Sequence, residues 1–145
     1  MERRGEGRAS IVVQRRIEWS DTDASGRWHN STAFRLIEVA ETALFDRLGL
    51  LEETYGRVPR VHIAVDFKRL LSFREIVDAS LEIVAVGRSS ATYGVELATD
   101  GHTCVTGKVV VALVDAHGRP EAWSERHRNL LLESGPQAPE RLVVG

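Results

Sequence analysis

Apolar residues recur at every second position through most of the chain, and this alternation limits the possible fold more than any other feature. A period of two places successive side chains on opposite faces of a β-strand, so each alternating window predicts a half-buried strand. Asp100-Gly101 separates two of these windows, as the turn of a β-hairpin does. We therefore expect a sheet with one buried face. Its strands are predicted over residues 11–19, 61–67, 77–83, 93–97 and 102–114.

One segment follows a different period. Between residues 31 and 48 the apolar positions are separated by gaps of three, one, three, four and four, which place them on one face of an α-helix. Asn30 or Ser31 can cap the start of this helix, and Gly49 can end it. A shorter helix is expected over residues 124–133. The order of a strand, one long helix and four strands predicts an α+β fold, with an antiparallel five-stranded sheet wrapped around one central helix.

Length and composition are those of one globular domain. We expect this domain over residues 11–133, between a flexible N-terminus (residues 1–10) and a poorly ordered tail (residues 134–145) that holds two prolines and no periodic pattern. The net charge of −2 creates no general attraction to nucleic acid or to an anionic membrane. We also find no membrane-spanning apolar run, no signal peptide and a single cysteine, Cys104. These features favour a cytoplasmic protein without nucleic-acid or membrane partners.

The stretch SDTDASGRWHNS, residues 20–31, joins the first strand to the long helix and has three interpretations. The first is an ordinary turn and helix cap, because Asp, Ser, Gly and Asn all favour turns. The second is a metal site, but Ser25 and Gly26 do not continue a calcium loop, and His29 stands too isolated for zinc. We therefore expect no metal ion and no cofactor.

The third interpretation is catalysis. Backbone N–H groups in the first turn of a helix can bind an oxygen that gains negative charge. The N–H groups near Asn30 belong to the first turn of the predicted helix. Asp21 or Asp23 beside that point can attack a carbonyl carbon or activate water. An aspartate with an ordinary pKa of about 4 is a weak base, which suits a reactive acyl donor such as a thioester.

The segment EWSDTDASGRWHNSTAFRLIEVA, residues 18–40, resembles the start of the 4-hydroxybenzoyl-CoA thioesterase family. Residues 61–97 and 105–120 continue the likeness with weaker signals, so that it covers roughly residues 11–130. Its most specific part is the motif Asp-Thr-Asp-Ala-X-Gly before a helix. The resemblance implies the hotdog fold, in which a sheet wraps one long helix. It also implies the hydrolysis of an acyl-CoA thioester to a free acid and CoA.

The resemblance further implies roles for single residues. Asp23 corresponds to the catalytic carboxylate, acting as nucleophile or as general base, and Gly26 lets the loop approach the substrate. The backbone N–H at Asn30 would polarise the thioester carbonyl. A helical glutamate acts in a related branch, so Glu38 or Glu41 is a second catalytic candidate. The remaining predicted substrate contacts are Trp28 and His29 on the acyl side, and Arg88, Ser89 and Ser90 near the CoA phosphates.

Departures from the family pattern leave the acyl group undefined. Ala33 stands where relatives usually carry an aromatic residue, and His29-Asn30 replaces their usual pair. Relatives place the site at a subunit interface, which implies a homodimer or a homotetramer built from two dimers. Two alternatives stay open: release of acyl groups from the phosphopantetheine arm of a carrier protein, and a hotdog module that binds acyl-CoA without hydrolysing it.

Overall fold

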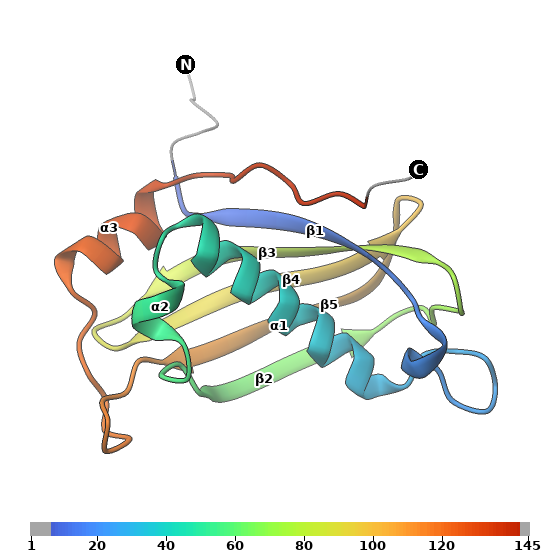
Figure 1. Cartoon of the computed structure of the whole chain (residues 1–145), viewed down its shortest axis with the longest axis horizontal. Coiled ribbons are helices and arrows are strands. Elements are labelled where there is room, and N and C mark those ends of the chain that lie inside the picture. The colour runs from blue at the N-terminus through green and yellow to red at the C-terminus, as the bar shows by residue number, and fades with distance from the viewer. Residues whose placement is uncertain (1–6, 143–145) are drawn as a thin grey trace.

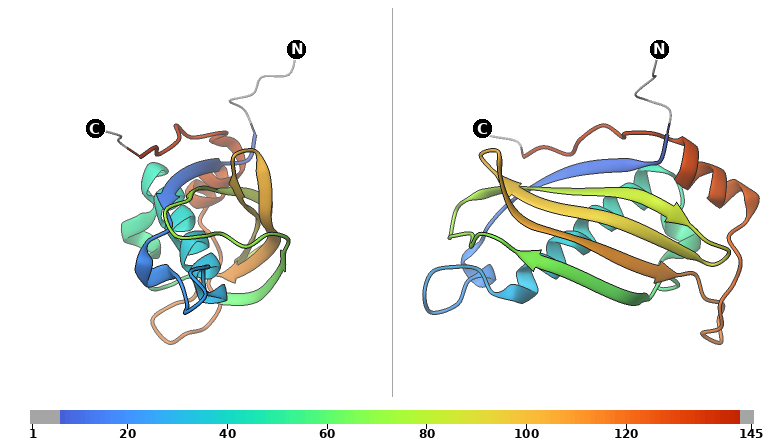
Figure 2. Two further views of the ribbon diagram at one scale, coloured as in Figure 1. Left: turned by 90° about the vertical axis from the view of Figure 1, so that its right-hand side faces the viewer. Right: turned by 180° about the vertical axis from the view of Figure 1, so that it is seen from behind.

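The computed structural model describes residues 7–142. Five strands form a single antiparallel sheet in the order β1-β3-β4-β5-β2, with β1 and β2 at its edges (Figure 1). The sheet curves around the long helix α1, as the two views in Figure 2 show. This arrangement confirms the predicted α+β fold with one central helix. The strands are β1 (Ser10–Arg16), β2 (Arg60–Phe67), β3 (Ile76–Val86), β4 (Ser90–Thr99) and β5 (His102–Ala112).

The helix α1 (Asn30–Arg47) supplies the centre of the hydrophobic core. The apolar positions that predicted it are buried: Leu36, Ile37 and Leu44 are at most 2% exposed. Each such side chain stabilises the fold by about 1.5–3 kcal/mol. Gly49 follows the helix with a φ of 72°, in agreement with the predicted end. The predicted cap was wrong, because the capping residue is His29 and neither Asn30 nor Ser31.

The first predicted strand is shorter than the alternation suggests. β1 ends at Arg16, and Trp19–Asp21 form a 3-10 turn, η1, in which Trp19 is 67% exposed. Ile17 extends the pairing of β1 onto the β2–β3 connection, and the chain turns away only after it. Its N–H donates to the Glu75 carbonyl at 2.8 Å, and its carbonyl accepts from the Arg74 N–H at 2.9 Å. Trp19 therefore lies on the surface and not on the buried face of a strand.

Strand β2 departs from the expected burial. The alternation predicted one buried face, yet Val61, Ile63 and Phe67 are 61%, 38% and 42% exposed. The reason is position: β2 pairs only with β5, while α1 packs mainly against β1 and β3. An edge strand with exposed apolar side chains favours pairing with another strand.

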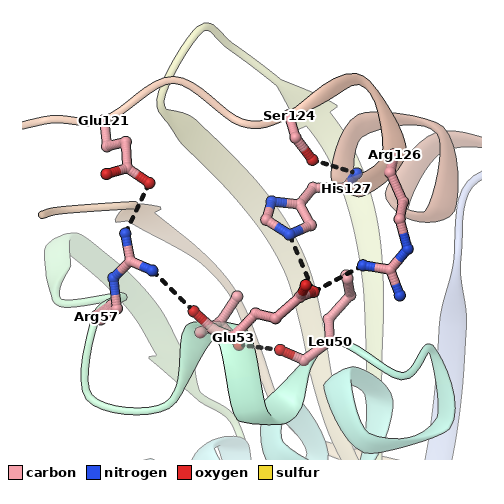
Figure 3. A network of polar contacts seen from close by, with 8 residues as sticks. Leu50, Glu53, Arg57, Glu121, Ser124, Arg126 and His127 are labelled. Carbon is pink, nitrogen blue, oxygen red and sulfur yellow. Dashed lines mark hydrogen bonds and ion pairs between the residues drawn. The ribbon is translucent and has the colours of Figure 1, made fainter.

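Two short helices meet at the end of the sheet where α1 finishes, α2 (Leu51–Thr54) and α3 (Glu125–Glu133). Figure 3 shows the Glu53 carboxylate between Arg126 and His127, at 2.7 Å and 3.1 Å. Hydrogen bonds from Arg126 and then His127 lower the pKa of Glu53. Arg57 pairs with Glu121 at 2.7 Å beside them. This network connects α3 to α2, and the predicted C-terminal helix is confirmed.

The chain after α3 runs along β1. Hydrogen bonds join the Gln137 N–H to the Ser10 carbonyl and the Glu140 N–H to the Val12 carbonyl. The expected lack of order therefore does not hold for residues 134–142, because the open edge of β1 offers partners that no local pattern reveals. Residues 1–6 of the predicted flexible N-terminus and residues 143–145 of the tail lie outside the described residues. Between residues 7 and 142, no helix is long and apolar enough to cross a membrane.

Candidate active site

The loop between β1 and α1 is a narrow hairpin at one end of the sheet (Figure 1). Thr22 and Trp28 pair across it, and the Asp23 N–H donates to the Arg27 carbonyl at 2.9 Å. Gly26 turns this hairpin with a φ of 79°, a conformation that is unfavourable for residues with a Cβ. No atom outside the neighbouring residues lies within 4 Å of where its Cβ would stand. The structure thus requires Gly26 for its backbone angle, and its approach to a substrate stays a prediction.

Asp21 is the buried aspartate of this loop, with 6% of its surface exposed. Its Oδ2 accepts from the Glu18 N–H at 2.8 Å, and its Oδ1 accepts from the Arg35 guanidinium at 2.6 Å. Its backbone carbonyl also accepts from the His29 N–H and the Thr32 hydroxyl, at 2.8 Å and 2.9 Å. The side chain and the backbone carbonyl of Asp21 therefore both hold the loop against the start of α1, and both carboxylate oxygens already accept hydrogen bonds.

Asp23 is the exposed aspartate. Its Oδ1 accepts from the Ser25 hydroxyl at 2.5 Å and from the Ser25 N–H at 2.8 Å. These two bonds, the hydroxyl's first, lower the pKa of Asp23, so the group is a carboxylate at neutral pH. Within residues 7–142 its Oδ2 accepts no hydrogen bond and its carboxylate forms no ion pair. One oxygen is therefore fixed and the other is available to a substrate.

One backbone N–H in the first turn of α1 has no acceptor within residues 7–142. The Ser31 N–H donates to Nδ1 of His29 at 3.2 Å, and the Thr32 N–H donates to the His29 carbonyl at 2.9 Å. The Asn30 N–H, one residue before Ser31, finds no acceptor among the described residues. It can bind an anionic oxygen, which the helix dipole also favours. Because Nδ1 of His29 is an acceptor, the neutral imidazole carries its proton on Nε2.

An aromatic cluster adjoins the start of the helix. Trp28 is 2% exposed and packs edge-on against Phe67, with ring centroids 6.5 Å apart. Phe34, in the first turns of α1, packs against the same Phe67 ring at 6.4 Å. Trp28 is thus mainly a core residue, while Phe67 and Phe34 present the more accessible apolar surface. The sequence did not single out either phenylalanine for this site.

The structure does not bring the predicted CoA-contacting residues to Asp23 within one chain. Arg88, Ser89 and Ser90 lie at the turn between β3 and β4, whereas the Asp23 loop lies beside the start of β3 (Figure 1). β3 has 11 residues, so its ends are about 33 Å apart. The side chain of Arg88 is exposed at this far end.

Glu38 is also distant from the start of the helix, since it follows Asn30 by eight residues, or about 12 Å along the axis. Its carboxylate lies 3.8 Å from Arg60. Glu41, one turn further, accepts from the Tyr93 hydroxyl at 2.6 Å and from Arg60 at 3.2 Å. Burial, followed by the charge of Glu41, raises the pKa of Tyr93 well above its usual value. Glu38, Glu41 and Arg60 line a cleft of about 510 Å³ between α1, α2 and β2.

Sequence reasoning missed two residues that organise the loop. Ser25 counted only as a break in a calcium pattern, yet it orients the Asp23 carboxylate. In an Asx turn, the side chain of an Asp accepts a hydrogen bond from the backbone N–H two residues later. The Asp23-Ala-Ser25 spacing was therefore a local signal for the role of Ser25. Arg35 holds Asp21 from 14 residues away, and no local signal indicates this pairing.

Taken together, the end of the sheet beside Asp23 holds the two groups that acyl transfer requires. One is an ionised carboxylate with a free oxygen, and the other is an N–H donor for a developing oxyanion. In the part of the chain that the structure describes, no three His, Cys, Asp or Glu side chains converge as a metal site would require.

Comparison with known proteins identifies relatives of this chain. A family model described as the thioesterase-like superfamily matches residues 17–140. The uncharacterized protein YsmA of Bacillus subtilis (strain 168) is 28% identical over 123 residues, which is 81% of this chain and 82% of that protein.

Solved structures share the fold. A predicted thioesterase from Bacillus stearothermophilus superposes with a TM-score of 0.77 at 22% identity, over 84% of this chain and 93% of that one. A thioesterase from Thermus thermophilus, complexed with coenzyme A and Zn, gives a TM-score of 0.75 at 24% identity, over 90% and 95% of the two chains.

Proposed function

Because this chain belongs to the thioesterase-like superfamily, we propose that it hydrolyses an acyl-CoA thioester at the loop that carries Asp23. The chain is a thioester hydrolase. The acyl-CoA substrate and the role of each residue are the proposal. The relative from Thermus thermophilus that is complexed with coenzyme A supports the choice of CoA as the thiol part of the substrate.

One observation supports Asp23 above its neighbour. The two aspartates of the motif have opposite surroundings: Asp21 is buried and bonded through both oxygens, whereas Asp23 is exposed and keeps one oxygen free among the described residues. A carboxylate that is already paired with Arg35 cannot approach a substrate without losing that pair. Asp23 has no such restriction.

In the proposed reaction the thioester carbonyl oxygen accepts a hydrogen bond from the Asn30 N–H. The free oxygen of Asp23 attacks the carbonyl carbon, the carbon–sulfur bond breaks, and the CoA thiolate leaves and takes a proton from solvent. Water then hydrolyses the mixed anhydride, which releases the acid and restores the carboxylate. Alternatively, Asp23 removes a proton from a water molecule that attacks the carbonyl directly. Both routes use the same two groups.

The other predicted residues have supporting roles in this proposal. His29 maintains the helix start through its cap, and Trp28 supports the aromatic wall against which an acyl group would lie. Glu38 lies about 12 Å along the helix from Asn30, so it stays a candidate only for a thioester bound by another copy of the chain. Gly26 provides the turn that presents Asp23.

We propose that two copies pair through their β2 edges. A two-fold axis at this edge would run the two β2 strands antiparallel and cover Val61, Ile63 and Phe67. It would also bring the β3–β4 turn of one copy toward the Asp23 loop of the other. Arg88, Ser89 and Ser90 would then reach the CoA phosphates of a thioester bound at the partner's loop. Two such dimers would form the predicted tetramer.

The reaction is tested by following thiol release from a panel of aliphatic and aromatic acyl-CoAs. Asp23→Asn should lower kcat at least about 100-fold, since general-base or nucleophilic groups contribute on this scale. Asp46→Asn, an exposed aspartate on α1, is the matched control and should keep full activity. Full activity in Asp23→Asn would refute the assignment of Asp23, and an inactive wild type on every thioester would refute the reaction.

The dimer is tested by sedimentation. Ile63→Lys places a charge in the proposed β2 contact and should shift the protein to monomers with weaker CoA binding. Asn129→Lys introduces the same charge on the exposed side of α3 and should leave the mass unchanged. A wild-type monomer would exclude the shared site.

A further inference from the structure

The turn between β3 and β4 has a one-sided pattern of hydrogen bonds. Every backbone carbonyl over residues 86–90 accepts a hydrogen bond. The N–H groups of Arg88 and Ser89, by contrast, donate to no acceptor among the described residues. The turn therefore keeps its acceptors occupied and leaves two successive donors available to a ligand.

Arg128 of α3 is the first of two residues that hold this turn from outside the sheet. Its guanidinium donates from Nη1 to the Gly87 carbonyl at 2.7 Å and from Nη2 to the Val86 carbonyl at 3.2 Å. Arg128 is half-buried, and within residues 7–142 it forms no ion pair. A guanidinium that bonds to two successive carbonyls in place of a carboxylate fixes the backbone that it contacts. Figure 1 shows α3 beside this turn, at the left end of the sheet.

Trp123, just before α3, is the second of these residues and is 6% exposed. Its backbone N–H donates to the Arg88 carbonyl, and its indole Nε1 donates to the Ser90 carbonyl, both at 2.9 Å. The indole packs edge-on against His127 of α3, with ring centroids 6.1 Å apart. This packing fixes the direction in which the indole N–H points.

The free donors of the turn form one group. The hydroxyls of Ser89 and Ser90 make no hydrogen bond among the described residues, and the exposed guanidinium of Arg88 makes no ion pair there. Gly87 leaves room for one of these hydroxyls, because a Cβ at this position would collide with Oγ of Ser90. Successive N–H groups with hydroxyls and a guanidinium beside them suit the oxygens of a phosphate.

We propose that Arg128 and Trp123 are positioning residues for the phosphates of CoA, and that they act through the β3–β4 turn. By holding the carbonyls, they keep the N–H groups of Arg88 and Ser89 free for a phosphate, so that the turn need not reorganise on binding. This inference rests on the proposed function, in which the turn of one copy serves the thioester at the partner's loop. It adds the residues that prepare the turn, and neither of them has to touch the substrate.

Helix α3 has a second attachment that does not involve the turn. Arg126 pairs with Glu53 of α2 at 2.7 Å, and Leu131 is fully buried. The helix would therefore stay docked without the bonds of Arg128. Arg126→Gln removes a contact of the same helix and leaves the turn untouched, so it is the matched control. Comparing the two arginine variants separates the position of the turn from the attachment of the helix.

The test compares two thioesters with the same acyl group, an acyl-CoA and the acyl-pantetheine that lacks the nucleotide. Arg128→Gln should raise KM for the acyl-CoA about tenfold and change kcat less than about twofold, as the loss of a binding contact does. Trp123→Phe keeps the ring and the net charge, and it should raise the same KM about threefold through loss of one hydrogen bond. Arg126→Gln should keep the wild-type KM. All three variants should cleave the acyl-pantetheine like the wild type.

Three results would overturn the proposal. The first is an unchanged KM for the acyl-CoA in Arg128→Gln or in Trp123→Phe; the latter would assign the effect to the charge of Arg128 alone. The second is an equal rise for the acyl-pantetheine, which would indicate general damage to the fold. The third is an equal rise in Arg126→Gln, which would assign the effect to the docking of α3.

Calorimetric titration with CoA itself needs no hydrolysis and separates this inference from the proposed function. Asp23→Asn should bind CoA like the wild type, and Arg128→Gln should bind it about tenfold more weakly. Such binding in a protein that cleaves no thioester would refute the proposed function and leave the positioning role supported. Hydrolysis that depends on Asp23, with equal CoA binding by Arg128→Gln and the wild type, would do the reverse. A wild type that binds no CoA would overturn the positioning role.

Discussion

The contrast between Asp21 and Asp23 leads to a prediction for the same substitution, Asp to Asn, at both positions. It should lower stability at Asp21 and activity at Asp23. Asp21→Asn replaces a buried carboxylate that accepts from the Glu18 N–H at 2.8 Å and from Arg35 at 2.6 Å. An asparagine has a single oxygen, so its NH₂ group must face one of these two donors. The substitution therefore removes one hydrogen bond and places two donors against each other.

The magnitude follows from these contacts. A hydrogen bond to a charged group contributes about 1.5–3 kcal/mol. The side chain of Arg35 is 50% exposed, so solvent screens its ion pair and the lower part of that range applies to it. We expect Asp21→Asn to lower the free energy of unfolding by about 2–3 kcal/mol. For a chain of 145 residues this corresponds to a fall in Tm of roughly 5–10 °C.

Asp23→Asn is the matched variant. The Asn oxygen can still accept from Ser25, and the site is exposed, so the free energy of unfolding should change by less than about 0.5 kcal/mol. Urea titrations followed by tryptophan fluorescence measure stability, and thiol release measures activity. Stability should fall in Asp21→Asn, whereas activity should be lost in Asp23→Asn. Equal stability of Asp21→Asn and wild type would refute the structural role of the buried carboxylate.

Gly107→Ala should lower the free energy of unfolding, measured in urea, by about 1–3 kcal/mol. A Cβ at this position would lie 2.5 Å from the Ala64 carbonyl oxygen and 2.9 Å from Cα of Val65. An unchanged urea midpoint would show that β2 can move away from the new Cβ without loss of stability. His29→Ala should cost about 0.5–2 kcal/mol through loss of the helix cap, with His29→Asn as the variant that restores it. Tyr93 has a pKa that folding raises, so its contribution is complete below about pH 10 and is lost as the pH rises through the folded pKa. Stability should therefore fall more between pH 9 and pH 11 in wild type than in Tyr93→Phe, and equal losses would contradict this.

The sequence alone determined the elements with a regular period. The alternating windows became β-strands and the segment from 31 to 48 became α1, because each side chain's face depends only on its neighbours along the chain. The same local reasoning located the loop between β1 and α1 and its two aspartates. It also identified Gly49 as the end of the helix, since a left-handed residue there needs only its own backbone freedom.

Only the tertiary structure decided which of these residues are available. Asp21 is buried and paired with Arg35, which reaches it from the second turn of α1, and this pairing distinguishes its surroundings from those of Asp23. Val61 and Ile63 are exposed although their alternation is the same as that of a covered strand, because α1 packs mainly against β1 and β3, away from the β2 edge. Burial depends on partners distant in sequence, which a local period does not contain. For the same reason, Arg88 lies beyond the far end of β3, a strand about 33 Å long, from the Asp23 loop, and its predicted place in the site requires a second copy.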